Sequence, residues 1–420
     1  MMERIIQQVE AECVALHEQV NKMVEINQKR VLEAFKNNRI GDYHFNSTDG
    51  YGYDDLGREG LEKLYAEVFG GEDALVRPQI ISGTHAISTT LFSLLRPGDE
   101  LLYITGAPYD TLEEVIGKRG NQSGSLKDYH IEYNEIPLLE SGNVDFQEVE
   151  KAITSKTKVI GIQRSKGYSD RPSFTIDEIA EMVNFIKGIN ENIIVFVDNC
   201  YGEFVEECEP LHVGADVIAG SLIKNPGGGL VRSGGYIVGK EHIVEQAANR
   251  LTAPGLGKEA GATLNMLQEM YQGFFLAPHV VGESIKGSIF TARLMELLGY
   301  TTTPHYQAKR TDLIQSITFN DPEQMIAFCQ AIQENSPINS FVAPYPSKMP
   351  GYDNEVIMAA GTFIQGASIE LSADGPIKPP YLVFVQGGLT YAHVKLAIIG
   401  CVNKLIEKGY IQQGNLIISK

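Results

Sequence analysis

The sequence lacks the features of several large classes of protein. Its five cysteines are odd in number and free of CxxC spacing, so they indicate neither a disulfide framework nor a zinc site. The nine histidines show no H-E-x-x-H or paired spacing, and we predict no metal site. The segment GYGYDDLG lacks the G-x-G-x-x-G order, which argues against a dinucleotide fingerprint.

Long apolar runs and positive charge are also scarce. No segment is a charge-free apolar stretch of about 20 residues, and the N-terminal segment carries charges throughout, so we expect neither a membrane span nor export. With 35 basic against 53 acidic residues, the formal charge of -18 would repel nucleic acid and anionic lipid. We therefore expect a cytoplasmic protein without a nucleic-acid or membrane partner.

The chain is long enough for two globular domains, since 43% of its 420 residues are hydrophobic. Residues 1–40 place apolar side chains at helical spacing, which predicts an N-terminal helical arm that packs either on its own domain or on a second subunit. Residues 41–300 alternate helical patterns with short apolar runs, which predicts an α/β domain whose mainly parallel sheet is wrapped by helices. These runs are DALVRPQIIS, DELLYIT, KVIGIQ, NIIVFVDN and ADVIAGSLIK.

The last part of the chain has a different pattern. Residues 241–298 read as a long helical region, interrupted near Pro254 and Pro278. Residues 301–420 then contain the apolar runs DLIQSITF, EVIMAAGTFI and PYLVFVQ and a closing helical pattern, LTYAHVKLAIIGCVNKLIEKG. They predict a smaller C-terminal α+β domain.

Polar residues follow two of the predicted strands. In SGTHA, Gly83 and Thr84 begin a helix, whose free backbone donors and positive dipole end suit a phosphate; an ordinary helix cap is the alternative. His85 either borders that site or is a satisfied histidine near a helix start. Asp198 ends the run IIVFVD, where open α/β folds bind ligands, and an acid there can keep a pyridine nitrogen protonated. A helix cap or a buried structural pair is the alternative.

Three further residues lie at strand ends. Lys224 precedes the turn NPGGG, where partial desolvation would lower its pKa so that a neutral amine forms an imine with an aldehyde; the alternative is a surface lysine. Ser221 either reaches a phosphate oxygen or is a turn serine. Tyr109 follows the run DELLYIT and either stacks on a flat heterocycle or is a partly exposed core tyrosine.

Taken together, these residues supply each contact that a phosphorylated pyridine aldehyde requires. In the order of these features along the chain, namely phosphate turn, stacking aromatic, strand-end aspartate and lysine, the chain resembles the fold-type I pyridoxal-phosphate enzymes. The resemblance is specifically to their cystathionine and methionine lyase branch. The resemblance implies that pyridoxal 5'-phosphate is bound as a Schiff base. It assigns the phosphate to Gly83, Thr84 and Ser221, ring stacking to Tyr109, the ring nitrogen to Asp198 and the imine to Lys224.

The chain is still more similar to a bacterial subgroup of methionine gamma-lyase-like proteins that is named for aluminium resistance. The similarity is carried by STDGYGYDDLGREGLE, SGTHA, VDNCYGEF, SLIKNPGGG, RSGGYIVG and PPYLVFVQGGLTYAHVK. In related lyases, a tyrosine and an arginine of the neighbouring subunit reach the cofactor phosphate, and Tyr51, Tyr53 and Arg58 occupy the comparable region with a different spacing. The resemblance therefore implies a homodimer or homotetramer with shared active sites, in which Tyr53 contacts the cofactor.

One departure from the resemblance concerns the substrate. Amino-acid lyases of this fold usually bind the substrate carboxylate through an arginine of the small domain, but this sequence has no arginine after Arg310. Lys378 and Arg164 are the remaining candidates. The resemblance implies a carbon-sulfur lyase that acts on a sulfur-containing amino acid by β- or γ-elimination. The alternatives are another reaction of the same cofactor, such as transamination, aldol cleavage or racemisation, and a non-catalytic regulator that binds it.

Overall fold

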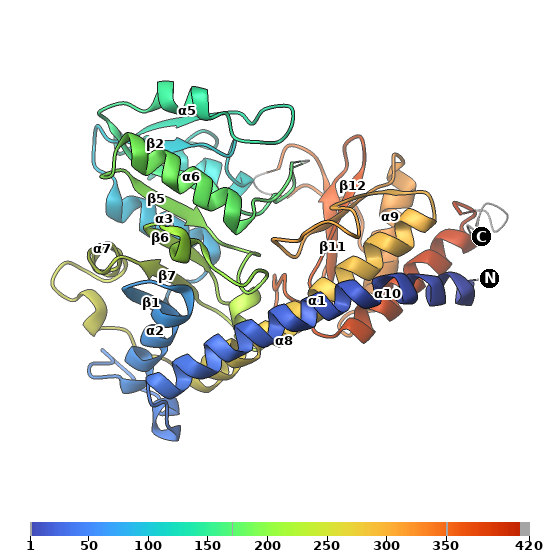
Figure 1. Ribbon diagram of the computed structural model, residues 1–420, viewed down its shortest axis with the longest axis horizontal. Coiled ribbons are helices and arrows are strands. Elements are labelled where there is room, and N and C mark those ends of the chain that lie inside the picture. Colours follow the sequence, from blue (N-terminus) through green and yellow to red (C-terminus); the bar gives the residue numbers. More distant parts are fainter. Residues whose placement is uncertain (1, 170, 350–351, 412–420) are drawn as a thin grey trace.

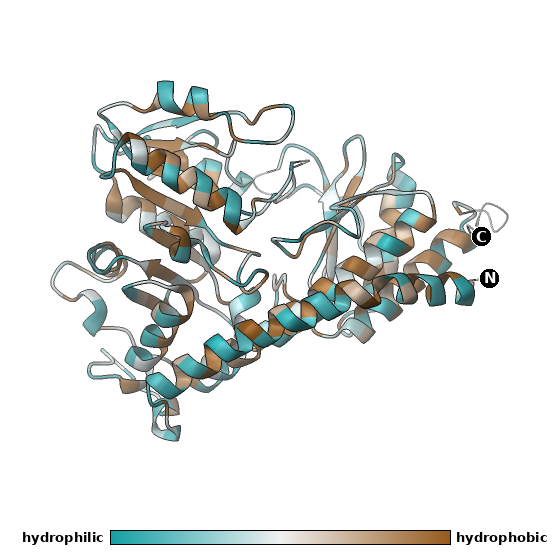
Figure 2. Cartoon of the chain, in the orientation of Figure 1, coloured by the Kyte–Doolittle hydropathy of each residue, from teal (hydrophilic) through white to brown (hydrophobic). Residues whose placement is uncertain are grey.

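The computed structural model describes residues 2–169, 171–349 and 352–411. Figure 1 shows two β-sheets next to each other, with two long helices running along both of them. The helices are α1 (Met2–Asn37) and α8 (Leu267–Leu297), which pack against each other. In Figure 2 the strands of the large sheet are mainly hydrophobic, whereas α1 carries both kinds of residue, as a helix with one buried face does.

The large sheet has seven strands, of which six are parallel. In spatial order they are β1 (Asp73–Arg77), β7 (Gly235–Gly239), β6 (Val217–Ser221), β5 (Ile194–Asp198), β4 (Thr157–Gln163), β2 (Glu100–Tyr103) and β3 (Glu132–Glu135). Only β7 is antiparallel to its neighbours. The mainly parallel sheet confirms the prediction, although β3 and β7 were not among the predicted strands.

Helices cover the large sheet on both faces, so alternate side chains of a strand enter two different cores. On β5, Val195 and Val197 belong to one hydrophobic cluster and Phe196 to the other. The covering helices are α2 (Leu56–Phe69), α3 (Gly83–Leu94), α4 (Asp110–Ile116), α5 (Phe146–Ala152), α6 (Ile176–Ile189) and α7 (Glu241–Leu251). Single turns of 3-10 helix lie at η1 (Asp42–Phe45), η2 (Pro210–Val213), η3 (Asn225–Gly227) and η4 (Gly257–Glu259).

The small sheet is antiparallel throughout. Its strands, in spatial order, are β10 (Val356–Ala359), β11 (Ser372–Pro376), β12 (Leu382–Gln386), β9 (Gln315–Thr318) and β8 (Thr301–Thr303). The helices α9 (Pro322–Glu334) and α10 (Tyr391–Glu407) pack against each other beside it. The α+β character of the C-terminal part is as predicted, whereas β8, β11 and α9 were not predicted.

The arm α1 packs on its own chain, which is one of the two arrangements that its pattern allowed. Glu12 pairs with Arg293 of α8, and Glu10 pairs with Lys395 of α10. Nearer its C-terminal end, the Asn27 side-chain amide donates to the carbonyl oxygens of Phe204 and Glu206, at 3.0 and 3.1 Å. The arm therefore connects helices beside the small sheet with a loop of the large sheet.

The helical region of residues 241–298 is interrupted once, not twice. The break falls between α7 and α8 and includes Pro254, as expected, but Pro278 lies inside α8, so the interruption expected there is wrong. A proline in a helix interior costs about 3 kcal/mol. Pro278 is buried, as are Phe274 and Ala277 before it, and this tertiary packing outweighs the local preference of the proline.

The division of the chain at residues 40 and 300 stays a prediction, although α8 ends at Leu297 and β8 begins at Thr301. Among the described residues, no helix combines the length and the apolar character that crossing a membrane requires. In the same part of the chain, no three His, Cys, Asp or Glu side chains are grouped so that they could bind a metal ion.

Candidate active site

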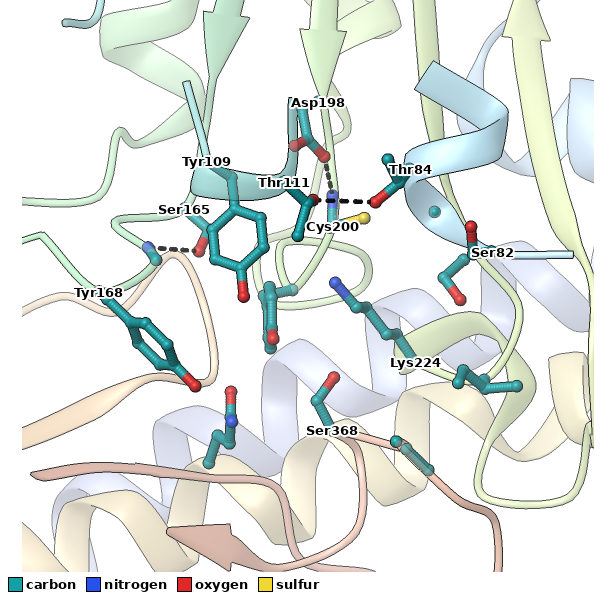
Figure 3. Close-up of a pocket in the computed structure, with 18 of the residues that line it drawn as sticks. Ser82, Thr84, Tyr109, Thr111, Ser165, Tyr168, Asp198, Cys200, Lys224 and Ser368 are labelled. Atoms are coloured by element: carbon teal, nitrogen blue, oxygen red, sulfur yellow. Dashed lines mark hydrogen bonds between the residues drawn. The ribbon is translucent and has the colours of Figure 1, made fainter. Parts of the chain in front are cut away.

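A cavity of about 290 Å³ lies where the carboxyl ends of the large sheet's strands face the small sheet. Open α/β sheets bind ligands at this edge. Six of the predicted site residues line the cavity, although they come from distant parts of the chain (Figure 3). They are Gly83, Thr84, Tyr109, Asp198, Ser221 and Lys224.

The N-terminus of α3 forms one wall of this cavity. Ser82 caps the helix, because its Oγ accepts a hydrogen bond of 3.0 Å from the His85 N–H. A Cβ atom on Gly83 would lie 3.3 Å from the Cys200 Sγ and 3.4 Å from the Ser221 Cβ, so a larger residue would narrow the wall at this point. The Thr84 hydroxyl lies 3.1 Å from that of Thr111. Backbone donors and hydroxyl groups thus meet at the positive end of a helix, which fits a phosphate.

Asp198 ends β5 and lies almost completely inside the protein. Its Oδ1 accepts a hydrogen bond of 3.1 Å from the Cys200 N–H. Burial raises the pKa of Asp198, while the nearby Lys224 ammonium and the Cys200 N–H lower it. A buried carboxyl group at a strand end fits a ligand that presents an N–H group with positive character, such as a protonated pyridine nitrogen.

Lys224 follows β6 and is positioned by the turn η3. Gly228, at φ +54°, ends this turn, and a Cβ atom there would lie 2.4 Å from the Gly273 carbonyl oxygen of α8. Only glycine therefore allows the turn to pack so closely on the helix. The Lys224 Nζ lies 4.0 Å from the centre of the Tyr201 ring, which is a cation–π contact.

The charge on Lys224 differs from the expectation. Burial of the amine lowers its pKa, but Cys200 and Tyr201, and after them Asp198 and Glu203, raise it by more, so that the pKa lies above its usual value. The expectation of a lowered pKa was therefore wrong, because it considered desolvation without the acidic thiol, phenol and carboxyl groups that share the site.

Tyr109 lies at the start of α4, where it faces the cavity. Its backbone N–H donates to the Gln163 Oε1 at 2.6 Å, and its hydroxyl lies 2.6 Å from that of Tyr352. Burial raises the pKa of Tyr109 far above its usual value, so the ring is neutral. These contacts hold the backbone and the hydroxyl of Tyr109 at the wall of the cavity, where its ring can stack on a flat ligand.

Two of the predicted cofactor contacts do not line the cavity. His85 is half-buried, and its Nδ1 accepts a hydrogen bond of 3.2 Å from the Ile81 N–H, so it completes the start of α3. Tyr53 is 51% exposed and stacks on Tyr51 at a centroid distance of 5.4 Å. Arg58 is buried and donates to the carbonyl oxygens of Gly261 and Glu259, so its guanidinium group is used within the chain.

The two candidates for a substrate carboxylate are not brought to the cavity either. Arg164 is fully buried, and its guanidinium donates to the Asn199 Oδ1 at 2.8 Å and pairs with Glu206 and Glu209 at 3.3 and 3.5 Å. It thus neutralises two buried carboxylates, which corrects the expectation that it faces a substrate. Lys378 is exposed and lines a neighbouring depression of the surface.

The cavity also has residues that the sequence did not single out. Tyr168 and Tyr201 contribute aromatic rings, and Ser368, Asp374 and Gln386 come from the part of the chain that forms the small sheet. Asp374 is 4% exposed; burial raises its pKa to about 7, although hydrogen bonds from Tyr168 and Gln386 lower it. Tyr201 lies three residues after Asp198 in VDNCYGEF, and its φ of +72° is rare for a side chain of this size. That motif could have drawn attention to it.

Comparison with known proteins gives consistent results along the chain. The sequence matches the methionine gamma-lyase family over residues 2–406. It is 63% identical over 412 residues to a Bacillus subtilis (strain 168) protein named YnbB, whose function is uncharacterised, and the match covers 98% of each chain.

Solved structures agree with this match. A candidate cystathionine beta-lyase involved in aluminum resistance, from Listeria monocytogenes, superposes with a TM-score of 0.95 at 60% identity, over 96% of this chain and 99% of that one. A candidate O-acetylhomoserine (thiol)-lyase from Campylobacter jejuni has a TM-score of 0.55 at 17% identity, over 82% and 85% of the two chains, and shares the fold. The fold is thus that of the fold-type I pyridoxal-phosphate enzymes, as predicted.

Proposed function

The chain belongs to the methionine gamma-lyase family of carbon-sulfur lyases, and we propose that it cleaves a carbon-sulfur bond of a sulfur-containing amino acid with pyridoxal 5'-phosphate held on Lys224. The observation that carries the proposal is the meeting, in one cavity, of a helix N-terminus, a buried carboxyl group, an aromatic ring and a lysine. Each of these groups matches a different part of that cofactor.

Four contacts would hold the cofactor. The backbone N–H groups of Gly83 and Thr84 and the hydroxyl of Ser221 would bind its phosphate, Tyr109 would stack on its ring, and Asp198 would accept the N–H of its pyridine nitrogen. The bound cofactor supplies an electron sink for negative charge that develops on the substrate Cα.

Lys224 has two functions in this proposal. Its ε-amine, once it has lost its proton, would hold the cofactor aldehyde through a covalent link formed with loss of water. After an incoming amino group has displaced it, the same amine in its neutral form would accept the proton from the substrate Cα. Asp198 would keep positive charge on the ring nitrogen, and the Tyr201 ring lies with its face toward the Lys224 amine. Departure of the sulfur group at the β or γ position, with a proton, would give the thiol, and hydrolysis of the remaining unsaturated amine by one water molecule would give keto acid and ammonia.

The test uses the purified protein and two matched variants. We expect the wild type to show a yellow imine band that borohydride bleaches, and to release keto acid, ammonia and thiol from cystathionine, methionine or cysteine. Lys224→Ala should lack the band and lose activity by about 10²- to 10⁴-fold or more, the usual contribution of a general base. Lys22→Ala, a change on the exposed face of α1, should retain both.

The possible results distinguish the candidate reactions. A protein that stays colourless after addition of the cofactor would overturn the proposal as a whole. A yellow protein that releases no keto acid or ammonia from any of the three amino acids would reject the lyase and leave another reaction of the cofactor or a regulatory role. Exchange of the Cα proton in deuterated water then separates these two, because a regulator without turnover does not catalyse it.

We also propose that two copies of the chain share each active site. Tyr51 and Tyr53 are exposed aromatic side chains, stacked on each other and outside the cavity of their own chain, so a second copy could place Tyr53 near its phosphate site. In a homodimer or homotetramer, Tyr53→Phe should weaken cofactor binding. A monomer in sedimentation at working concentration would reject this arrangement.

A further inference from the structure

Asp374 is a charged residue of the cavity for which the proposed cofactor has no partner. It lies on β11 of the small sheet and is 4% exposed. Among the described lining residues, the only Asp, Glu, Lys, Arg or His side chains are those of Asp198, Lys224 and Asp374. The cofactor would use Asp198 at its ring nitrogen and Lys224 at its aldehyde, so that Asp374 is left to face the substrate.

Among the described residues, the Asp374 carboxyl group forms no ion pair. The Gln386 amide donates to its Oδ2 at 3.0 Å and the Tyr168 phenol interacts with the carboxyl group, whereas no described residue meets the buried Oδ1 at hydrogen-bond geometry. A buried carboxylate without a cation is destabilised by its loss of hydration. A ligand that brings a cation to Oδ1 would remove much of this cost.

The rings around Asp374 also favour a cation. The phenol groups of Tyr109, Tyr168, Tyr201 and Tyr352 all lie close enough to Asp374 to interact with it electrostatically. A phenol oxygen can accept a hydrogen bond from an ammonium group, and the neighbouring carboxylate strengthens the attraction of a cation to this position. A second carboxylate, from a substrate, would instead be repelled at this position.

We propose that Asp374 binds an ammonium group on the substrate side chain, beyond the sulfur atom. The preferred substrates are then thioether amino acids with a terminal amine rather than an alkyl or carboxylate end. This inference rests on the proposed function for the reaction at sulfur, but the ammonium contact itself does not depend on turnover.

Binding of two unreactive amino acids tests the contact directly. L-Lysine and L-2-aminoheptanoic acid have no carbon-sulfur bond and differ in one group, because a methyl group replaces the terminal ammonium in the second. In calorimetric titrations of the purified protein, L-lysine should bind about 10- to 100-fold more tightly, as expected for one charged hydrogen bond. Equal affinities, tighter binding of the alkyl compound, or no binding of either would overturn the inference.

Matched variants assign the effect to Asp374. Asp374→Asn keeps the shape of the side chain and removes its charge, so affinity for L-lysine should fall to within about 3-fold of that for L-2-aminoheptanoic acid. Asp353→Asn removes a charge from a carboxylate that is 80% exposed and outside the cavity lining, and should keep the preference. Loss of the preference in both variants, or in neither, would overturn the assignment. If Asp374→Asn does not fold, the wild-type comparison still decides.

A second pair of compounds separates this inference from the proposed function. S-(2-aminoethyl)-L-cysteine should release keto acid with a kcat/KM about 10- to 100-fold above that of S-propyl-L-cysteine. Equal turnover of both would reject the role of Asp374 and keep the lyase. No keto acid from either would reject the lyase, and the affinities of the unreactive pair would still decide on Asp374.

Discussion

Glu203 is a buried carboxyl group whose replacement should stabilise the protein at high pH. It is fully buried; its Oε1 accepts a hydrogen bond of 2.6 Å from the Tyr236 hydroxyl, and its Oε2 has no partner in the described part of the chain. Burial raises the pKa of Glu203 to about 8, although the Tyr236 hydroxyl and Lys224 lower it. Glu203→Gln keeps the shape and the acceptor for Tyr236 but cannot ionise.

The sign and size of the effect follow from the two pKa values. The folded-state pKa, about 8, lies above the usual value of 4.5. Between these values the unfolded chain ionises and the folded protein does not, so each pH unit destabilises the wild type by about 1.4 kcal/mol. Below pH 4.5 the ionisation of Glu203 does not change the free energy of unfolding, and above about pH 8 its destabilising effect stays constant. When the pH rises from about 5.5 to about 8.5, the free energy of unfolding of the variant should therefore increase by about 3 kcal/mol relative to that of the wild type.

Thermal unfolding at these two pH values measures the difference. With about 2.1 cal/mol/K of unfolding entropy per residue, 420 residues give a shift of about 3 °C in the Tm difference between variant and wild type. Glu207→Gln, an exposed carboxylate nearby, should show no such change. Any pH-independent effect of the Glu203→Gln side chain on stability is the same at both pH values and cancels in the comparison. A Tm difference that stays constant with pH, or one that moves against the variant, would refute the account of Glu203 as an uncompensated buried acid.

Two further substitutions test the packing around the site. Arg164→Leu should destabilise the protein by about 1–3 kcal/mol in urea unfolding, because Glu206 and Glu209 lose their fully buried cation and keep only Lys309 and Arg30, which are more exposed. The exposed Arg232→Leu should stay within about 0.5 kcal/mol, and equal effects would contradict this. Asn27→Ala removes the donor to two buried carbonyl groups and should cost about 1–3 kcal/mol, seen as faster hydrogen exchange in the C-terminal half of α1. Unchanged exchange there would show that these bonds do not hold the arm.

The strands that the sequence predicted share a physical property. In β4, β5 and β6 almost every side chain is buried, so both faces need apolar residues and the run is continuous. The edge strand β3 (EYNE) has two exposed and two half-buried side chains and carries no such pattern. The helix α9 could have been found, because Asp321 caps it and Pro322 occupies its first turn.

The small sheet shows why one part of the site could not be predicted. The strand β11 (SADGP) is polar and contains glycine and proline, which are depleted in strands, yet all five of its residues are buried. It is buried because β10 and β12 pair with it on both sides, and such long-range pairing leaves no local pattern. Asp374 lies on this strand, so its place in the cavity could not be predicted either.

The large-domain part of the site could be predicted because it is local in sequence. Asp198 ends a continuous apolar strand, and Lys224 lies three residues beyond the end of another. The carboxyl ends of parallel strands lie at one edge of a sheet, so a residue that follows an apolar run is placed there before any tertiary contact is known. The charge on Lys224 could not be predicted in this way, because it depends on acidic groups at and after the end of β5, first Cys200 and Tyr201 and then Asp198 and Glu203.

Three buried charged side chains show how surroundings decide between a structural and a functional role. Arg164 meets two carboxylates and an amide, so its charge is neutralised inside the protein and nothing is left for a ligand. Within the described residues, Glu203 forms no ion pair and does not line the cavity, so burial raises its pKa and the carboxyl group takes up a proton. Asp374 likewise forms no ion pair with a described residue, but it does line the cavity. A ligand cation can reach Asp374 in the cavity. The lack of a cation partner, which makes Glu203 take up a proton, would therefore make Asp374 bind the ammonium group of a substrate.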